Sequence, residues 1–246
     1  MIQKDKMLID AHVHTLASGH AYSSLYEVAE NAKEKGLQAI FVAEHGPAME
    51  GTVHDYYYHN YCTVPRQYKG VRLFMGCEAN ILDNKGTIDL SERAVQECDI
   101  IIASLHDRCI QAGSKEENTK AIINVMKNPA ISIIGHPDDS RFPLDYQEIV
   151  KAAEYYNVLL EANNSSLLGN CYRQDTKRNI IKYLSLCMKY NVKISLGSDA
   201  HICDNVGSLS EIILLLNKME FPSELIITQN ISQFETYLIT KMNKNK

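Results

Sequence analysis

The sequence lacks the features that would place the protein in a membrane or along a nucleic acid. None of its 246 residues belong to an apolar run of about 18 residues, the length a membrane-spanning helix needs. The N-terminal MIQKDKMLID has no apolar core of a signal peptide. The net charge is −5, and the densest basic stretch is the C-terminal KMNKNK. We therefore expect a cytoplasmic protein with no membrane partner and no nucleic-acid partner.

Paired cysteine motifs and flexible linkers are missing as well. The seven cysteines are scattered along the chain without a CxxC pair, which indicates reduced thiols rather than a disulfide framework or a zinc finger. No stretch rich in proline, glycine or serine divides the chain, and no internal repeat is visible. We therefore predict a single domain over residues 1–246.

Short apolar runs alternate with amphipathic stretches. The expected strands are Met7–His14, Gln38–Ala43, Val71–Glu78, Ile100–Leu105, Ile131–Gly135, Val158–Ala162 and Lys193–Gly197. The expected helices are Ser24–Lys35, Ser91–Glu97, Glu116–Lys127, Tyr146–Tyr156, Thr176–Tyr190 and Ser208–Lys218. Strands that alternate with helices predict parallel βαβ units and an α/β fold, either closed into a barrel or laid out as an open sheet.

Two local features refine this prediction. Ser24 and Glu27 have the spacing of a capping box at the start of a helix, and Gly36 suits its end. The stretch Pro47–Gly70 interrupts the alternation with five tyrosines among GTVHDYYYHNYCTVPRQY. We interpret it as a long connection that lines the mouth of a site, contacts a second copy of the chain, or simply exposes its tyrosines to solvent.

Polar residues gather where the predicted strands end. Seven of the nine histidines lie at these ends or in the loops that follow, namely His12, His14, His20, His45, His106, His136 and His201. The carboxylates there are Asp10, Glu44, Glu78, Asp107, Asp138, Asp139, Glu161 and Asp199. In barrels and open parallel sheets the C-terminal edge of the strands is where sites are built. The remaining His54 and His59 lie in the tyrosine-rich connection and are not expected to bind a metal.

So many imidazoles at one edge require a common explanation. Protonated rings would repel one another, and neutral rings would be costly to bury without partners. Divalent metal ions relieve both problems, because neutral imidazole and carboxylate are ligands that suit zinc, manganese or iron. The alternation within Asp10-Ala-His12-Val-His14 places three of these side chains on one face of a strand. The pattern therefore predicts a metal site.

The set of motifs resembles that of the polymerase-and-histidinol-phosphatase (PHP) family. DAHVHT, the histidine six residues further on, EHG, GCEAN, LHD, GHP and SDAH follow one another in the family's order. HTLASGHAYSSLYE, EHGPAME, EANNSS and LGSDAH are most similar to the YcdX-type phosphatases of that family, and the likeness extends from about residue 7 to 230. The resemblance implies a distorted TIM-like barrel of seven βα units, with three metal ions at the C-terminal ends of the strands.

The resemblance also implies which residues bind the metals. One site would take His12, His14 and Asp199, with Glu78 as a bridge to a second site that adds His106 and His136. The third site would take His20, His45 and His201. The ions are most often zinc in this family, and manganese or iron would suit the same ligands. Asp10 is expected to orient one of the imidazoles from behind.

The implied activity is hydrolysis of a small phosphomonoester by a metal-bound hydroxide, with His12, His14, Glu78, His106 and Asp199 at the catalytic centre. Substrate contacts are expected from Arg108, Arg141, Asn163, Asn164 and Arg173. A metal-bound water or Asp107 would protonate the leaving group.

Three alternatives stay open. The chain could hydrolyse histidinol phosphate, act as a proofreading-type nuclease, or be a non-catalytic module whose metals only hold the fold. The lack of a basic groove argues against the nuclease. Self-association through the tyrosine-rich connection is a further prediction.

Overall fold

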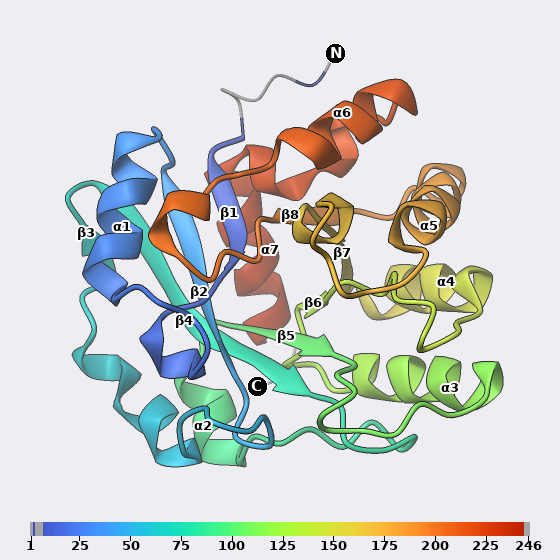
Figure 1. Cartoon of the computed structure of the whole chain (residues 1–246), viewed down its shortest axis with the longest axis horizontal. Coiled ribbons are helices and arrows are strands. Elements are labelled where there is room, and N and C mark those ends of the chain that lie inside the picture. Colours follow the sequence, from blue (N-terminus) through green and yellow to red (C-terminus); the bar gives the residue numbers. More distant parts are fainter. Residues whose placement is uncertain (1, 3–6, 244–246) are drawn as a thin grey trace.

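The computed structural model describes Ile2 and residues 7–243, and seven parallel strands form its centre (Figure 1). The strands are β1 (Ile9–Val13), β2 (Ala39–His45), β4 (Val71–Asn80), β5 (Ile100–Ser104), β6 (Ile133–Ile134), β7 (Leu159–Asn163) and β8 (Ile194–Gly197). They are hydrogen-bonded in the order β1-β2-β4-β5-β6-β7-β8. A short strand β3 (Gln67–Tyr68) pairs antiparallel with β4 at its outer end.

The sheet closes almost completely on itself, because β1 also meets β8. The backbone amide of His14 donates to the carbonyl of Ala200 at 2.9 Å, and the amide of Asp199 donates to the carbonyl of His12 at 2.9 Å. Val13 and Ala200 form the corresponding parallel bridge. Of the two arrangements left open by the alternating pattern, the barrel is therefore confirmed, as is the distorted TIM-like fold of seven βα units.

Helices follow the strands along the chain, and all but the last lie around the outside of the barrel (Figure 1). They are α1 (Leu25–Glu34), α2 (Glu92–Glu97), α3 (Lys115–Met126), α4 (Tyr146–Tyr156), α5 (Thr176–Tyr190), α6 (Ser210–Lys218) and α7 (Ile231–Asn243). The predicted capping box of α1 is confirmed, since Glu27 accepts from the amide of Ser24 at 2.7 Å and Ser24 accepts in return. Within the described residues, no helix combines the length and apolar character that crossing a membrane requires.

The last helix, α7, was not predicted and has a different position from the others. It lies near the centre of the view in Figure 1, whereas α1 to α6 lie around the periphery. Phe234 packs edge-on against Phe74 of β4, and the hydroxyl of Tyr237 donates to the carbonyl of Ser132 just before β6. Phe234 and Tyr237 are buried together with the inward-facing residues of the strands. The helix therefore closes the barrel at the N-terminal ends of its strands, opposite the predicted site.

The tyrosine-rich connection is more ordered than the sequence indicates. Residues Asp55–Thr63 form a 3-10 helix. Tyr58 and Tyr61 are buried, and their hydroxyls donate to the carbonyls of His45 at 2.6 Å and Gly76 at 2.9 Å. The interpretation that the tyrosines are exposed is therefore confirmed for Tyr56 and Tyr57 and wrong for Tyr58 and Tyr61. The two buried rings instead pack the connection against β2 and β4, and so fix the chain that follows His45.

Candidate metal centre

All nine predicted ligands lie at the C-terminal ends of the strands or in the loops that follow. β1 and its loop supply His12, His14 and His20, β2 and β4 supply His45 and Glu78, the loops after β5 and β6 supply His106 and His136, and the loop after β8 supplies Asp199 and His201. The register of β2 with β4 pairs His45 directly with Glu78. The closure of the barrel between β1 and β8 brings Asp199 to His14, at 3.3 Å between Oδ1 and Nε2.

The carboxylate of Glu78 is the centre of the cluster. It is buried, and its two oxygens face imidazoles from four different parts of the chain. The distances from a Glu78 oxygen to the nearest ring nitrogen are 2.8 Å for His45, 2.8 Å for His136, 3.2 Å for His106, 3.4 Å for His12 and 3.6 Å for His14. A carboxylate placed between so many rings is suited to bridge two metal ions.

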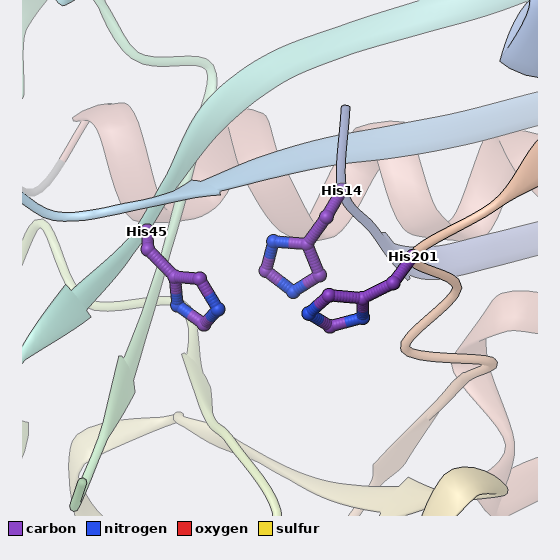
Figure 2. A group of neighbouring side chains, drawn as sticks. All are labelled: His14, His45 and His201. Carbon is purple, nitrogen blue, oxygen red and sulfur yellow. The ribbon is translucent and has the colours of Figure 1, made fainter. Parts of the chain in front are cut away.

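A second set of contacts extends the cluster toward the opening. Figure 2 shows the rings of His14, His45 and His201 facing one another, and their ligand atoms lie within 4.8 Å. His20 joins this group because its Nε2 lies 3.0 Å from Nε2 of His201. Further triplets of ligand atoms within the same limit are His12, His14 and Asp199, and His45, Glu78 and His106. The nine residues thus form one continuous cluster, whereas their division among three ions stays a prediction.

Several rings are held from behind, so that one nitrogen is occupied and the other faces the cluster. Nδ1 of His12 lies 2.8 Å from a carboxylate oxygen of Glu161, and Nδ1 of His106 lies 2.7 Å from the amide oxygen of Asn80. Nδ1 of His14 lies 3.0 Å from the hydroxyl oxygen of Ser18. Such partners fix the orientation and the protonated nitrogen of a metal-binding imidazole.

The donor atoms fit divalent metal ions. With Nδ1 occupied, Nε2 of His12 and Nε2 of His14 face each other at 3.0 Å, which two lone pairs do not tolerate without a proton or a cation between them. Nδ1 of His45 and Oε2 of Glu78 are buried and have no hydrogen-bond partner, although they lie only 2.8 Å apart. Nitrogen and carboxylate oxygen without thiolate are donors that zinc, manganese and iron accept.

The electrostatics of the cluster favour the neutral form of His14 and His20 and a cation at His12. Burial, aided by His45 and His201, lowers the pKa of His14 well below its usual value. Burial likewise lowers the pKa of His20 to about 4. Burial also disfavours a charged His12, but the nearby carboxylates, Glu161 first, outweigh it and raise the pKa of His12 well above its usual value. The surrounding carboxylates thus favour a positive charge at His12, which a proton or a metal ion can supply.

The two predicted acidic ligands are strongly ionised. Burial alone would raise the pKa of Glu78, yet the surrounding imidazoles, His106 first, hold it well below its usual value. Burial would also raise the pKa of Asp199, and this is outweighed by His12 and Arg173. Both carboxylates are thus in the charged form that binds metal ions.

A cavity of about 760 Å³ opens directly above the cluster. Seven of the nine predicted ligands line it, while His12 and His14 lie deeper. Arg108 and Arg173 also line the cavity. The buried guanidinium of Arg173 donates to Asp199 at 2.5 Å and to Ser166 at 2.6 Å, and its Nε is buried without a partner.

Other residues with predicted roles in the site are engaged in contacts within the protein. The Asp10 carboxylate accepts from the amide of Ser198 at 2.9 Å and from the amide of Gly207 at 2.7 Å, and the described contacts include no imidazole ring. The carboxylate also accepts from the backbone amide of His12 at 3.3 Å, while Glu161 contacts the His12 ring itself. The role of Asp10 behind an imidazole stays a prediction. Asp107 is paired with Arg141, which also binds Asp139 and is thus used within the protein.

The two asparagines are likewise used within the protein. Asn163 donates to Asp199 at 3.3 Å, and the side-chain oxygen of Asn164 accepts from the amide of Ile212 in α6. Both are buried, and neither lines the cavity. Their contacts do not fit the predicted binding of a substrate.

Comparison with known proteins identifies the family. Residues 10–168, more than half of the chain, match the PHP domain. The chain belongs to the PHP family. This PHP chain is 44% identical over 236 residues to a probable phosphatase of Clostridium novyi (strain NT), covering 96% of each chain. It is 43% identical over 230 residues to a probable phosphatase of Caldicellulosiruptor bescii, covering 94% of this chain and 95% of the relative.

Solved structures share the fold of this PHP chain at lower identity. Histidinol phosphate phosphatase from Lactococcus lactis, crystallised with zinc, L-histidinol and phosphate, aligns with a TM-score of 0.63 and 18% identity over 88% of this chain and 95% of that chain. A chain in the structure of archaeal ribonuclease P with mature tRNA aligns with a TM-score of 0.59 and 15% identity, over 95% of this chain and 90% of that chain. At these identities the likeness concerns the fold alone.

The residues behind the ligands of this PHP chain are not evident from its sequence. The pattern places Glu44 and Glu161 at strand ends without indicating a role, and it does not distinguish Asn80 or Ser18. The signal for Glu161 and Asn80 was their position on β7 and β4 next to ligand-bearing strands. Ser18 carries no such signal, because a serine in a loop is ordinary and only the folded chain shows what its hydroxyl contacts.

Proposed function

We propose that this chain is a metal-dependent phosphatase that hydrolyses small phosphomonoesters, with three divalent metal ions bound by the nine clustered ligands. The observation that carries the proposal is the convergence of nine nitrogen and oxygen ligands beneath a cavity of about 760 Å³. The curated relatives are named probable phosphatases, which supports the same reaction class. The zinc and phosphate in the histidinol phosphate phosphatase structure agree with it.

The three sites would use the ligand sets implied by the family. Three or four protein ligands for each ion leave coordination positions open, which is typical of catalytic rather than structural sites. When bound, such ions lower the pKa of coordinated water toward about 7 and stabilise the charge that develops on phosphoryl oxygens. The residues of the chain contribute by favouring the neutral form of His14 and His20 and by keeping Glu78 and Asp199 ionised.

Arg173 is the residue best placed to bind the phosphoryl group. It lines the cavity, lies beside Asp199, and its planar guanidinium is suited to phosphate oxygens. Arg108 also lines the cavity but is exposed and directly follows Asp107, so it would contact the more distant part of a substrate. The two arginines thus mark an inner and an outer end of the proposed substrate site.

The test is phosphate release by full-length chain loaded with zinc, and separately with manganese. The substrates would be a panel of phosphomonoesters that includes histidinol phosphate, together with one phosphodiester. We expect release from monoesters and little from the diester. His14→Ala should abolish it, because this ring contacts His12, Glu78 and Asp199.

A matched control is His54→Ala, which removes an exposed histidine outside the cluster and should leave the rate unchanged. Loading of each variant would be measured by mass spectrometry of bound metals. Fully loaded protein that hydrolyses no phosphoester would contradict the proposal and favour the non-catalytic alternative. Preferential hydrolysis of histidinol phosphate would identify the chain as a histidinol-phosphatase, and preference for the diester would favour the nuclease.

The proposal also concerns domain organisation, location and self-association, which this experiment does not test. We expect the whole of residues 1–246 to behave as one domain, the chain to act in the cytoplasm, and the substrate to be a small molecule. Self-association through the connection between β2 and β3 also stays a prediction. Its exposed Tyr56 is the first position to change in a measurement of the oligomeric state.

A further inference from the structure

A buried serine and a buried glutamate lie directly behind the predicted ligand His14. Ser18 ends a short 3-10 helix in the loop after β1, and Glu44 lies in β2, one residue before His45. Both side chains are buried. The hydroxyl of Ser18 lies 2.6 Å from Oε2 of Glu44 and 3.0 Å from Nδ1 of His14. Neither residue lines the cavity, so any role in the reaction must act through the ligands.

The contacts of the Ser18 hydroxyl determine which atom donates in each hydrogen bond. A hydroxyl has one hydrogen to donate and two lone pairs to accept with. The backbone amide of His45 donates to the Ser18 oxygen at 3.1 Å and occupies one lone pair. The hydroxyl hydrogen points to Oε2 of Glu44, an oxygen that also accepts from the amide of Thr15 at 3.2 Å. The remaining lone pair of Ser18 therefore faces Nδ1 of His14, which must supply the hydrogen.

Glu44 is fixed as an acceptor by its other contacts. The hydroxyl of Thr15 donates to Oε1 of Glu44 at 2.5 Å, so the carboxylate accepts from two hydroxyls and one amide. All these partners belong to the loop that follows His14. This arrangement ties the loop after β1 to β2 and fixes the Ser18 hydroxyl as the donor in its hydrogen bond to Glu44.

We propose that Ser18 and Glu44 are positioning residues that hold His14 in the Nδ1–H tautomer, so that its Nε2 lone pair is available to a metal ion. The same hydroxyl holds the backbone of His45, so one contact aligns two of the three rings in Figure 2. The inference rests on the proposed function only in that His14 binds a metal ion. Glu161 acts in the same way on His12, but there the carboxylate contacts the ring directly.

Tautomer state is measured first on the unaltered chain, which avoids any question of folding. The full-length protein is labelled with ¹⁵N in its imidazole rings and examined by NMR without metal and with zinc. The signals of His14 are assigned by comparison with His14→Ala. We expect the hydrogen on Nδ1 in both states and zinc bound through Nε2. A hydrogen on Nε2 of His14 in the zinc-loaded protein would overturn the proposal.

Ser18→Ala then tests whether the hydroxyl matters for binding. Removal of a partner behind a metal-binding imidazole typically weakens metal affinity by about 10- to 100-fold, and we expect a loss of this size for the weakest-bound zinc ion. The matched control is Ser104→Ala, which removes another buried hydroxyl, one with no hydrogen-bond partner. Zinc affinity is measured by competition with a chelating dye, and the NMR spectrum of Ser18→Ala should show a mixture of both His14 tautomers without metal.

The outcomes separate this inference from the proposed function. Zinc affinity and tautomer are read without any substrate, so an inactive chain with these properties would contradict only the phosphatase. An active chain in which Ser18→Ala and Ser104→Ala bind zinc equally well would overturn only the positioning role.

Discussion

Asp10 is expected to stabilise the loop that carries two predicted ligands, and Asp10→Ala tests this directly. Its buried carboxylate accepts from the amide of Ser198 at 2.9 Å, from the hydroxyl of Ser198 at 2.5 Å and from the amide of Gly207 at 2.7 Å. These donors flank Asp199 and His201 in the chain. Removal of the carboxylate therefore leaves both ends of this loop without their anchor on β1.

The magnitude follows from the donors left unpaired. A buried donor without a partner costs roughly 1–3 kcal/mol, so two backbone amides amount to about 2–6 kcal/mol. Burial of the carboxylate is itself unfavourable, as the raised pKa of Asp10 shows despite its contacts with Ser198, and the substitution removes that cost. We therefore expect the free energy of unfolding to fall by about 2–4 kcal/mol, the lower half of the range.

The assay is urea denaturation of the full-length chain in the presence of a chelator, so that metal binding does not contribute. Asp10→Asn is the matched comparison, because its amide oxygen still accepts from the amide of Ser198, whereas the amide of Gly207 loses its acceptor and the hydroxyl of Ser198 must turn to accept from the new NH2 group. A loss of about 1–2 kcal/mol is expected. A loss below about 1 kcal/mol in Asp10→Ala would refute the reasoning. Weaker zinc binding at His12 with unchanged stability would instead support the role behind an imidazole.

Three further outcomes are expected. Burial lowers the pKa of His12, but Glu161, Glu78 and Asp199 outweigh burial and raise it. The ring of His12 therefore keeps its proton above pH 6.5 in the metal-free fold. The stability that this proton contributes is lost only as the pH rises through the raised pKa. Zinc must displace that proton when it binds His12. Calorimetry of zinc binding in buffers of different ionisation enthalpy should detect about one proton released per chain at pH 7. A release of no proton would contradict the raised pKa of His12. Glu78→Gln should lose at least one bound metal ion per chain, because five imidazoles face this carboxylate, and metal analysis that shows full occupancy would contradict the bridging role. Arg173→Lys should raise KM for a phosphomonoester about 10-fold with unchanged metal content, since a hydrogen bond to a charged group contributes roughly 1.5–3 kcal/mol, and an unchanged KM would exclude phosphate binding by Arg173.

Much of the barrel could be predicted because its strands are short, apolar and bounded by polar residues. The prediction failed at the strand ends for a physical reason. β2 was expected to stop at Ala43 and β4 at Glu78, but β2 continues through His45 and β4 through Asn80. Polar side chains usually end a buried strand, whereas here they satisfy one another inside the cluster, so the backbone ladder continues beneath them.

β6 shows the opposite error. The sequence predicts a strand over Ile131–Gly135, yet the ladder contains only Ile133 and Ile134. A Cβ atom at Gly135 would lie 2.1 Å from the hydroxyl of Ser104, so β5 approaches too closely for any other residue there. His136 follows with φ of +25°, a conformation outside strand geometry that turns its ring toward Glu78. Such close approaches depend on the neighbouring strand and cannot be read from the pattern of one strand.

The contacts behind the ligands could not be predicted either, because they join residues that no local pattern relates. Asp10 and Ser198 are 188 positions apart, and His12 and Glu161 are 149 positions apart. A polar residue at a strand end indicates the edge where the site forms, but its partner depends on the register and on the closure of the barrel. This explains why the ligand types are visible in the sequence while the contacts of Asp10 with Ser198 and Gly207 are not.

Closure of the barrel and assembly of the cluster use the same backbone atoms. The two backbone hydrogen bonds between β1 and the loop after β8 join His14 to Ala200 and Asp199 to His12. Three of these four residues are predicted ligands, so the ligands meet only when the barrel closes. Asp199 holds its side chain toward His14 from a backbone with φ of +57°, a conformation that is costly for a residue other than glycine. The favourable contacts of its carboxylate with His14 and Arg173 offset that cost, which couples the shape of the barrel to the charge of the site.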